Sequence, residues 1–151
     1  MMVGEVDELD LTTEARLAST AARHGLRMLC VYGSTATGRA SAESDLDLAA
    51  WYGDPLRAIA AESDLIAEVL RELPPAAPPL DMTVLDLAEP LLTFMVAADG
   101  RPIFEDCPGA FVEFSVRASA AYRDSEKYRL RLREFLRDYA AAADRRGGAC
   151  R

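Results

Sequence analysis

The chain lacks any long apolar run. None of its stretches approaches the ~20 consecutive apolar residues that a membrane-spanning helix needs, although half of the 151 residues are hydrophobic. The first residues, MMVGEVDELDL, are acidic and do not have the positive-then-apolar layout of a secretory signal. We therefore expect a cytoplasmic protein that makes no contact with a membrane.

Cysteine and histidine are scarce, which argues against the common zinc and thiol redox motifs. The three cysteines, Cys30, Cys107 and Cys150, are odd in number, and no two of them have the close spacing of such a motif. Cys30 stands in an apolar run and is expected to be a buried, reduced thiol. The single histidine, His24, falls at the end of a predicted helix, where a contact with the helix dipole or solvent is expected instead of catalysis.

Positive charge is also in short supply. The chain has 17 Lys or Arg against 25 Asp or Glu, a formal net charge of -8. Binding to nucleic acid relies on basic surface that replaces phosphate counterions, so no direct nucleic-acid partner is expected. An acidic field favours divalent cations or a partner with a basic face, and charge alone does not choose between them.

The length suits one domain with one hydrophobic core, and the sequence contains no internal repeat. We expect residues 1–146 to form that domain and residues 147–151 to be a frayed tail. Apolar periodicity and turn residues predict the following elements: a helix capped by Thr12 or Thr13 and ended by Gly25, a strand at 26–33, a loop at 34–43, a strand at 44–52, a helix from 55 to 73, a strand at 80–87, a short helix at 89–98, a strand at 101–105, and a helical stretch from 109 to 145. This order predicts an α+β (α/β) fold, a small mixed β-sheet flanked by helices with a long C-terminal helix.

The segment GSTATGRASAESDLDL, residues 33–48, carries the chemistry. It places Gly33 and Ser34 at the end of one predicted strand and Asp45 and Asp47 on the next. Glycine lets the backbone approach a phosphate closely, and the Ser34 hydroxyl can donate to a phosphate. Arg39 is a candidate for offsetting phosphate charge.

The aspartates alternate with leucines, so Asp45 and Asp47 are expected to point to the same face of the strand, with roots ~6.6 Å apart. Two ionised carboxylates on one face repel unless a cation lies between them. Mg²⁺ prefers oxygen ligands and keeps positions open for water and phosphate. A third carboxylate is expected, and Asp81 is the first candidate because it opens a later strand. Asp86 lies an odd number of residues after Asp81, so its side chain is predicted to point to the opposite face of the strand.

On these residues the chain resembles the DNA polymerase β-like nucleotidyltransferase superfamily, and within it the minimal nucleotidyltransferases, close to the MntA antitoxins of HEPN/MNT toxin–antitoxin systems. The resemblance covers residues 26–106, including LDMTVLDLAEPLL and DGRPIFED. It implies a polymerase β-like fold and transfer of AMP from ATP, with two Mg²⁺ ions, to a tyrosine hydroxyl of a HEPN ribonuclease toxin that would also be its partner in a hetero-oligomer.

Carried over residue by residue, the resemblance assigns roles within the segment. Gly33, Ser34, Arg39 and Ser44 would bind the nucleotide. Asp45, Asp47 and Asp81 would hold metal, with Asp81 completing the metal site or taking the proton of the acceptor.

The chain departs from many relatives in the loop. Those relatives have an arginine directly after Gly-Ser and another before the loop glycine, where this chain has Thr35 and Thr37. Three functions stay open: an enzyme that modifies a protein, a binding module with a weakened site that neutralises a toxin by forming a complex, and a small-molecule nucleotidyltransferase. The intact acid pair favours the first of these.

Overall fold

The structure, a computed structural model, describes residues 9–39 and 44–147. Residues 1–8 of the acidic N-terminal segment, residues 40–43 of the loop predicted at 34–43 and residues 148–151 of the tail predicted at 147–151 lie outside these residues. In chain order the elements are α1 (Leu11–Arg23), β1 (Met28–Val31), α2 (Gly33–Ala36), β2 (Leu46–Trp51), α3 (Pro55–Glu72), β3 (Leu80–Val84), the 3₁₀ turn η1 (Leu85–Leu87), α4 (Pro90–Asp99), β4 (Arg101–Glu105), α5 (Ala110–Asp124) and α6 (Glu126–Gly147).

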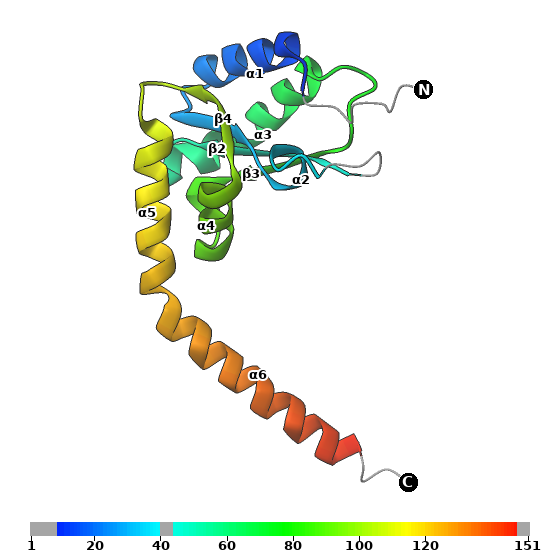
Figure 1. The fold of residues 1–151 in the computed structure, drawn as a ribbon, viewed down its shortest axis with the longest axis vertical. Coiled ribbons are helices and arrows are strands. Elements are labelled where there is room, and N and C mark those ends of the chain that lie inside the picture. Colours follow the sequence, from blue (N-terminus) through cyan, green and yellow to red (C-terminus); the bar gives the residue numbers. More distant parts are fainter. Residues whose placement is uncertain (1–8, 40–43, 148–151) are drawn as a thin grey trace.

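The four strands form one mixed sheet in the order β3-β2-β1-β4 (Figure 1). β1 pairs antiparallel with both β2 and β4, whereas β2 and β3 run parallel. The parallel pair needs a crossover, which α3 supplies between its two strands. The small mixed sheet flanked by helices, predicted from the order of elements, is confirmed.

Helices cover the sheet on both faces (Figure 1). On one face, Leu17 of α1 and Leu65 of α3 pack against Leu29 and Leu48 of the strands. On the other, buried residues of α4 and α5 pack against a second set of strand residues, namely Met28, Cys30, Ala49 and Trp51. Alternate residues of each strand therefore enter opposite layers of core, as strand geometry requires.

Several element boundaries differ from their predictions. Asp10, not Thr12 or Thr13, caps α1, because its carboxylate accepts a hydrogen bond of 2.7 Å from the Thr13 backbone N–H. The strand predicted over 80–87 ends at Val84 and continues as η1. The helical stretch predicted from 109 to 145 is two helices separated at Ser125, of which α6 is the expected long C-terminal helix.

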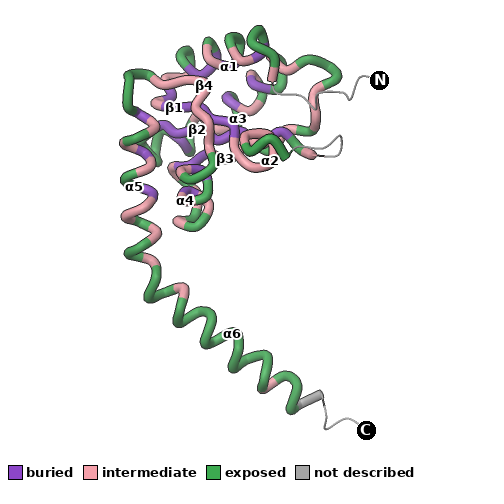
Figure 2. The backbone as a smooth tube through the Cα atoms, in the orientation of Figure 1, coloured by how far each residue is buried: buried purple, intermediate pink, exposed green. Residues whose placement is uncertain are grey.

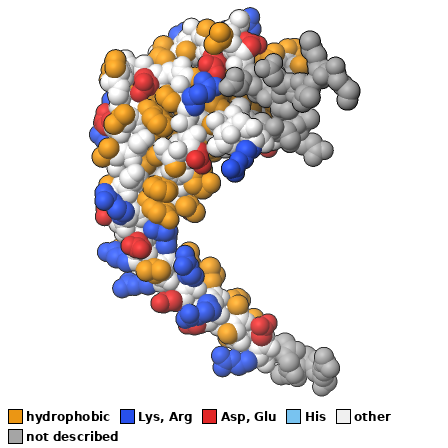
Figure 3. Space-filling view, viewed as in Figure 1, with side chains coloured by type: hydrophobic (Ala, Val, Ile, Leu, Met, Phe, Trp, Pro, Cys, Tyr) orange, Lys and Arg blue, Asp and Glu red, His pale blue; other side chains and the backbone are white. Residues whose placement is uncertain are grey.

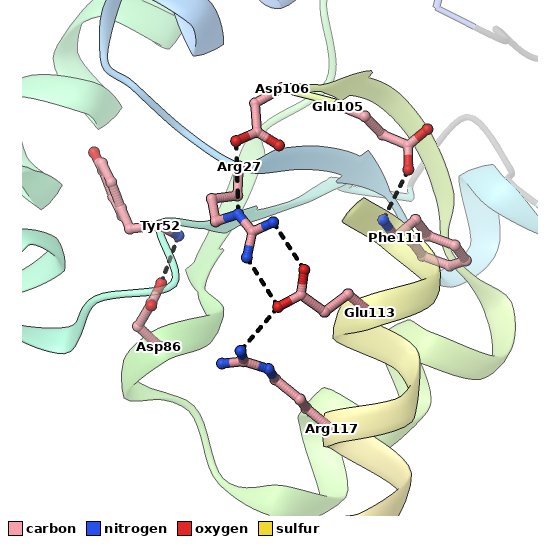
Figure 4. A network of polar contacts seen from close by, with 8 residues as sticks. All are labelled: Arg27, Tyr52, Asp86, Glu105, Asp106, Phe111, Glu113 and Arg117. Carbon is pink, nitrogen blue, oxygen red and sulfur yellow. Dashed lines mark hydrogen bonds and ion pairs between the residues drawn. The ribbon is translucent and has the colours of Figure 1, made fainter. Parts of the chain in front are cut away.

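A polar network anchors α5 to the sheet (Figure 4). The Arg27 guanidinium, just before β1, donates to both carboxylate oxygens of Glu113 at 3.0 and 2.8 Å and lies 4.8 Å from the centre of the Trp51 ring. The hydrogen bond from Arg27 lowers the pKa of Glu113. Glu105 at the end of β4 accepts from the Phe111 backbone N–H at 2.7 Å. These contacts set where α5 leaves the sheet.

No helix in the described part of the chain is long and apolar enough to cross a membrane.

Candidate functional site

A sharp turn ends β1 and begins the site. Tyr32 is still extended, and Gly33 follows with φ +67°, a left-handed conformation that glycine adopts without strain. The single helical turn α2 then starts, and the Thr37 hydroxyl donates to the Gly33 carbonyl at 3.1 Å. The segment predicted as a loop at 34–43 therefore begins with one turn of helix.

This turn lies against the second predicted strand. A Cβ placed on Gly33 would fall well inside van der Waals contact of the Asp47 carboxylate oxygen Oδ2 and 3.2 Å from its Cγ. The Tyr32 backbone N–H also donates to the Asp47 carbonyl at 3.1 Å. Gly33 therefore forms one wall of the space that holds the Asp47 side chain, and no other residue type leaves that space open.

Parallel pairing of β2 and β3 places Asp47 beside Asp81. The two residues are direct partners in the register, so their side chains leave the same face of the sheet. Asp45 lies immediately before β2, two residues from Asp47. Leu46 and Leu48 are buried on the opposite face, as the alternation predicts.

The three carboxylates interact electrostatically. Burial raises the pKa of Asp47, and the negative charges of Asp81 and then Asp45 raise it further. Asp47 is half-buried whereas Asp45 and Asp81 are exposed. The cluster therefore has one sheltered carboxylate between two that face solvent, and it carries an electrostatic strain that a bound cation would relieve.

Sequence analysis did not single out Tyr32 and Thr83, which lie next to this cluster. Their hydroxyl oxygens are 3.1 Å apart and share a hydrogen bond. Burial raises the pKa of Tyr32, and the charges of Asp81 and Asp47 add to that effect. Thr83 could have been found from strand alternation, because it is two residues after Asp81. Tyr32 follows β1, the antiparallel partner of β2, and no local pattern in the sequence indicates that its side chain lies beside the cluster.

The other predicted nucleotide-binding residues follow Gly33 in the sequence. Ser34 is half-buried in α2, and its carbonyl accepts from the Arg39 backbone N–H at 2.9 Å. The Arg39 side chain is exposed, and Ser44 is half-buried. Asp86, the rival third carboxylate, lies in η1, where it accepts from the Tyr52 backbone N–H at 2.8 Å (Figure 4). Asp86 therefore has a structural contact away from the cluster.

The residues present fit Mg²⁺ by their chemistry. Within residues 9–39 and 44–147, no group of three Asp, Glu, His or Cys is arranged as a ready-made metal site. Mg²⁺, however, is usually held by one or two carboxylates together with waters and the phosphates of its substrate, not by a closed protein cage. A half-buried carboxylate paired in register with a second, with a third two residues away, is such a donor set.

Residues 16–107 match the family model described as polymerase beta, nucleotidyltransferase. The chain belongs to this family, and the matched range includes the Gly33 turn and all three aspartates of the cluster. The sequence matches no curated protein at a significant level.

Solved structures share the fold. One, described as a toxin–antitoxin with AMP-PNP, has 20% identity and a TM-score of 0.63, covering 82% of this chain and 97% of the other. A second, the toxin–antitoxin MntA-HepT, has 18% identity and a TM-score of 0.64, covering 84% and 98%. A third, a tri-AMPylated Shewanella oneidensis HEPN toxin in complex with MNT antitoxin, has 15% identity and a TM-score of 0.56, covering 82% and 95%. At these identities, the likeness establishes the fold.

Proposed function

We propose that this nucleotidyltransferase is the antitoxin of a toxin–antitoxin pair and transfers AMP from ATP to a tyrosine hydroxyl of a HEPN-type toxin. The observation that carries the proposal is the contact between the Gly33 turn and Asp47, which stands in register with Asp81. A phosphate-binding turn beside paired carboxylates is what transfer of a nucleotide requires. The choice of AMP and of a HEPN partner is supported by the descriptions of the similar structures, which include an ATP analogue and an AMPylated toxin.

In the proposed reaction the tyrosine oxygen attacks the α-phosphorus of ATP. A new oxygen–phosphorus bond forms, the bond from the α-phosphorus to the bridging oxygen breaks, and pyrophosphate leaves. Gly33 lets the triphosphate approach the backbone, and the Ser34 hydroxyl donates to a phosphate oxygen. Arg39 and Ser44, further along the same segment, are proposed to contact the nucleotide.

Asp45, Asp47 and Asp81 would hold Mg²⁺. When bound, the metal supplies positive charge to the triphosphate and favours loss of the acceptor proton. A tyrosine hydroxyl has an ordinary pKa of about 10 and needs such help at neutral pH. Asp81, exposed at the edge of the cluster, is proposed to complete the metal site or to accept that proton.

The test is transfer of label from ATP labelled at its α-phosphate, with Mg²⁺, to a HEPN-type toxin. We expect labelled tyrosine, and a loss of at least about 100-fold in Asp45→Asn and Asp47→Asn. Asp99→Asn is the matched control, because Asp99 is an exposed aspartate at the end of α4. Wild-type transfer in either cluster variant would refute the catalytic assignment.

The alternative of a binding module with a weakened site is favoured by one observation: Arg39 is the only basic residue between Gly33 and Glu43. The same variants separate the two functions. A module that acts by masking its partner neutralises the toxin equally well with Asp47→Asn, whereas an enzyme does not.

A further inference from the structure

The helix α6 leaves the body of the protein almost alone (Figure 1). Every residue from 130 to 141 is exposed, and Figure 2 shows this as a continuous exposed segment. The start of α6 is nevertheless fixed, because Arg129 donates to the Tyr122 carbonyl at 3.1 Å and stacks on the Tyr122 ring at 3.7 Å. The helix therefore projects in a defined direction from the end of α5.

The exposed helix has a strongly apolar stripe. Tyr128, Leu132, Phe135 and Tyr139 are 61%, 57%, 63% and 60% exposed. Their spacing of four, three and four residues places them on one side of an α-helix, in the pattern of a coiled-coil seam. The rings of Phe135 and Tyr139 lie next to each other, with centres 6.3 Å apart and planes inclined by 26°. Figure 3 shows apolar side chains at intervals along this helix.

Such a stripe is unusual on a helix that is exposed from residue 130 to residue 141, since helices in proteins gain most of their stability by burying an apolar face. We infer that the stripe of Tyr128, Leu132, Phe135 and Tyr139, called here the α6 stripe, is the docking site for an acidic amphipathic helix of the partner toxin. The identity of the partner rests on the proposed function, whereas the chemistry of the site rests on α6 itself.

Charge selects an acidic partner. α6 has seven Lys or Arg against four Asp or Glu, in a chain whose net charge is -8. Four of the basic residues, Lys127, Arg129, Arg131 and Arg133, lie in the first part of α6 with no acidic residue among them, and Glu134 and Asp138 follow later. A second copy of α6 would bring the same excess of positive charge to the interface, which opposes association. A helix with acidic side chains would meet α6 with opposite charge.

The test measures the affinity of the 151-residue chain for a HEPN-type toxin, by calorimetry without ATP. We expect the double variant Leu132→Asp/Phe135→Asp to weaken binding by at least about 30-fold, the effect of losing a central interface residue. Leu130→Asp is the matched control: Leu130 is also exposed, at 48%, but lies on the opposite side of α6. It should change affinity by less than about threefold, within the range of near-neutral surface changes. Circular dichroism verifies that all variants keep their helix content.

Wild-type affinity in the double variant overturns the inference, as does an equal loss in Leu130→Asp. Sedimentation tests whether a second copy of this chain occupies the α6 stripe instead. If the isolated chain forms a stable dimer that the double substitution converts to a monomer, the stripe is a self-association site and the inference is overturned. Failure of the proposed function is distinguishable, because Asp47→Asn should bind the partner normally. Tight binding through the α6 stripe without any nucleotide transfer would refute the proposed enzymatic function and still support the proposed docking site.

Discussion

Replacing Gly33 by alanine should separate the stability of this protein from its activity. Gly33 has φ +67°, and a left-handed conformation costs a residue with a side chain about 1–2 kcal/mol. For a chain of this size, that cost lowers the melting temperature by about 2–8 °C. The new methyl group would also collide with the Asp47 carboxylate, which is the end of a side chain and can move aside at little further cost in stability.

That movement should abolish most of the activity. Cγ of Asp47 lies only 3.2 Å from the new Cβ and Oδ2 lies closer still, so the carboxylate must shift by a sizeable fraction of an ångström. A misplacement of about 1 Å in a reacting constellation can cost about 100-fold in rate. We therefore expect Gly33→Ala to be a folded protein with about 1% of the wild-type rate of transfer, measured with labelled ATP.

Gly109→Ala is the control for this experiment. Gly109 also has a positive φ, +94°, but a Cβ there meets nothing within 4 Å. This variant should share the loss in melting temperature and keep its activity, because Gly109 begins α5 and takes no part in the cluster. The reasoning fails if Gly33→Ala retains full activity while it loses stability as Gly109→Ala does, since the turn would then not position Asp47.

Three further predictions follow from the same structure. Asp47→Asn should raise the melting temperature of the metal-free protein at pH 7, because a raised pKa of Asp47 in the folded state means that the ionised carboxylate destabilises the fold. This gain should vanish as the pH falls below 3.8, the usual pKa of an aspartate, where both states are protonated. A lower melting temperature of the variant at pH 7, measured with chelator, would contradict this prediction. Arg27→Lys keeps the charge but loses the paired hydrogen bonds to Glu113, so the free energy of unfolding, measured in urea, should fall by about 1 kcal/mol. An unchanged free energy of unfolding would show that this pair of hydrogen bonds does not stabilise the fold. Iodoacetamide should alkylate the exposed Cys107 in the native protein but not Cys30, because burial raises the pKa of the Cys30 thiol to about 12. Modified Cys30 in native protein, found by peptide mass mapping, would refute this prediction.

Local sequence patterns predicted the secondary structure well where the residues that determine an element all lie within that element or directly beside it. Asp54 and Pro55 mark the start of α3, and the prolines from 74 onward mark its end. The alternation of Asp45 to Leu48 predicted which residues of β2 face the core. Boundaries were wrong where the deciding partner was not the expected one, as when Asp10 took the capping position assigned to Thr12 or Thr13.

The candidate site was predicted in part for the same reason. Gly33, Ser34, Asp45 and Asp47 lie within one segment, and their pattern could be recognised without knowing the fold. Tyr32 and Thr83 could not be linked in this way, because they come from β1's end and from β3, which does not neighbour β1 in the sheet.

By itself, the order of residues determined which groups this protein has for chemistry: a glycine turn and a pair of alternating aspartates. These properties depend on backbone geometry within a few residues. The sequence favoured Asp81 over Asp86, but only the tertiary structure shows how Asp81 comes to lie beside Asp47, because the parallel register of β2 and β3 fixes which side chains become neighbours. It also decided that α6 stands away from the core, since a helical pattern predicts an apolar face but does not reveal whether the same chain covers it.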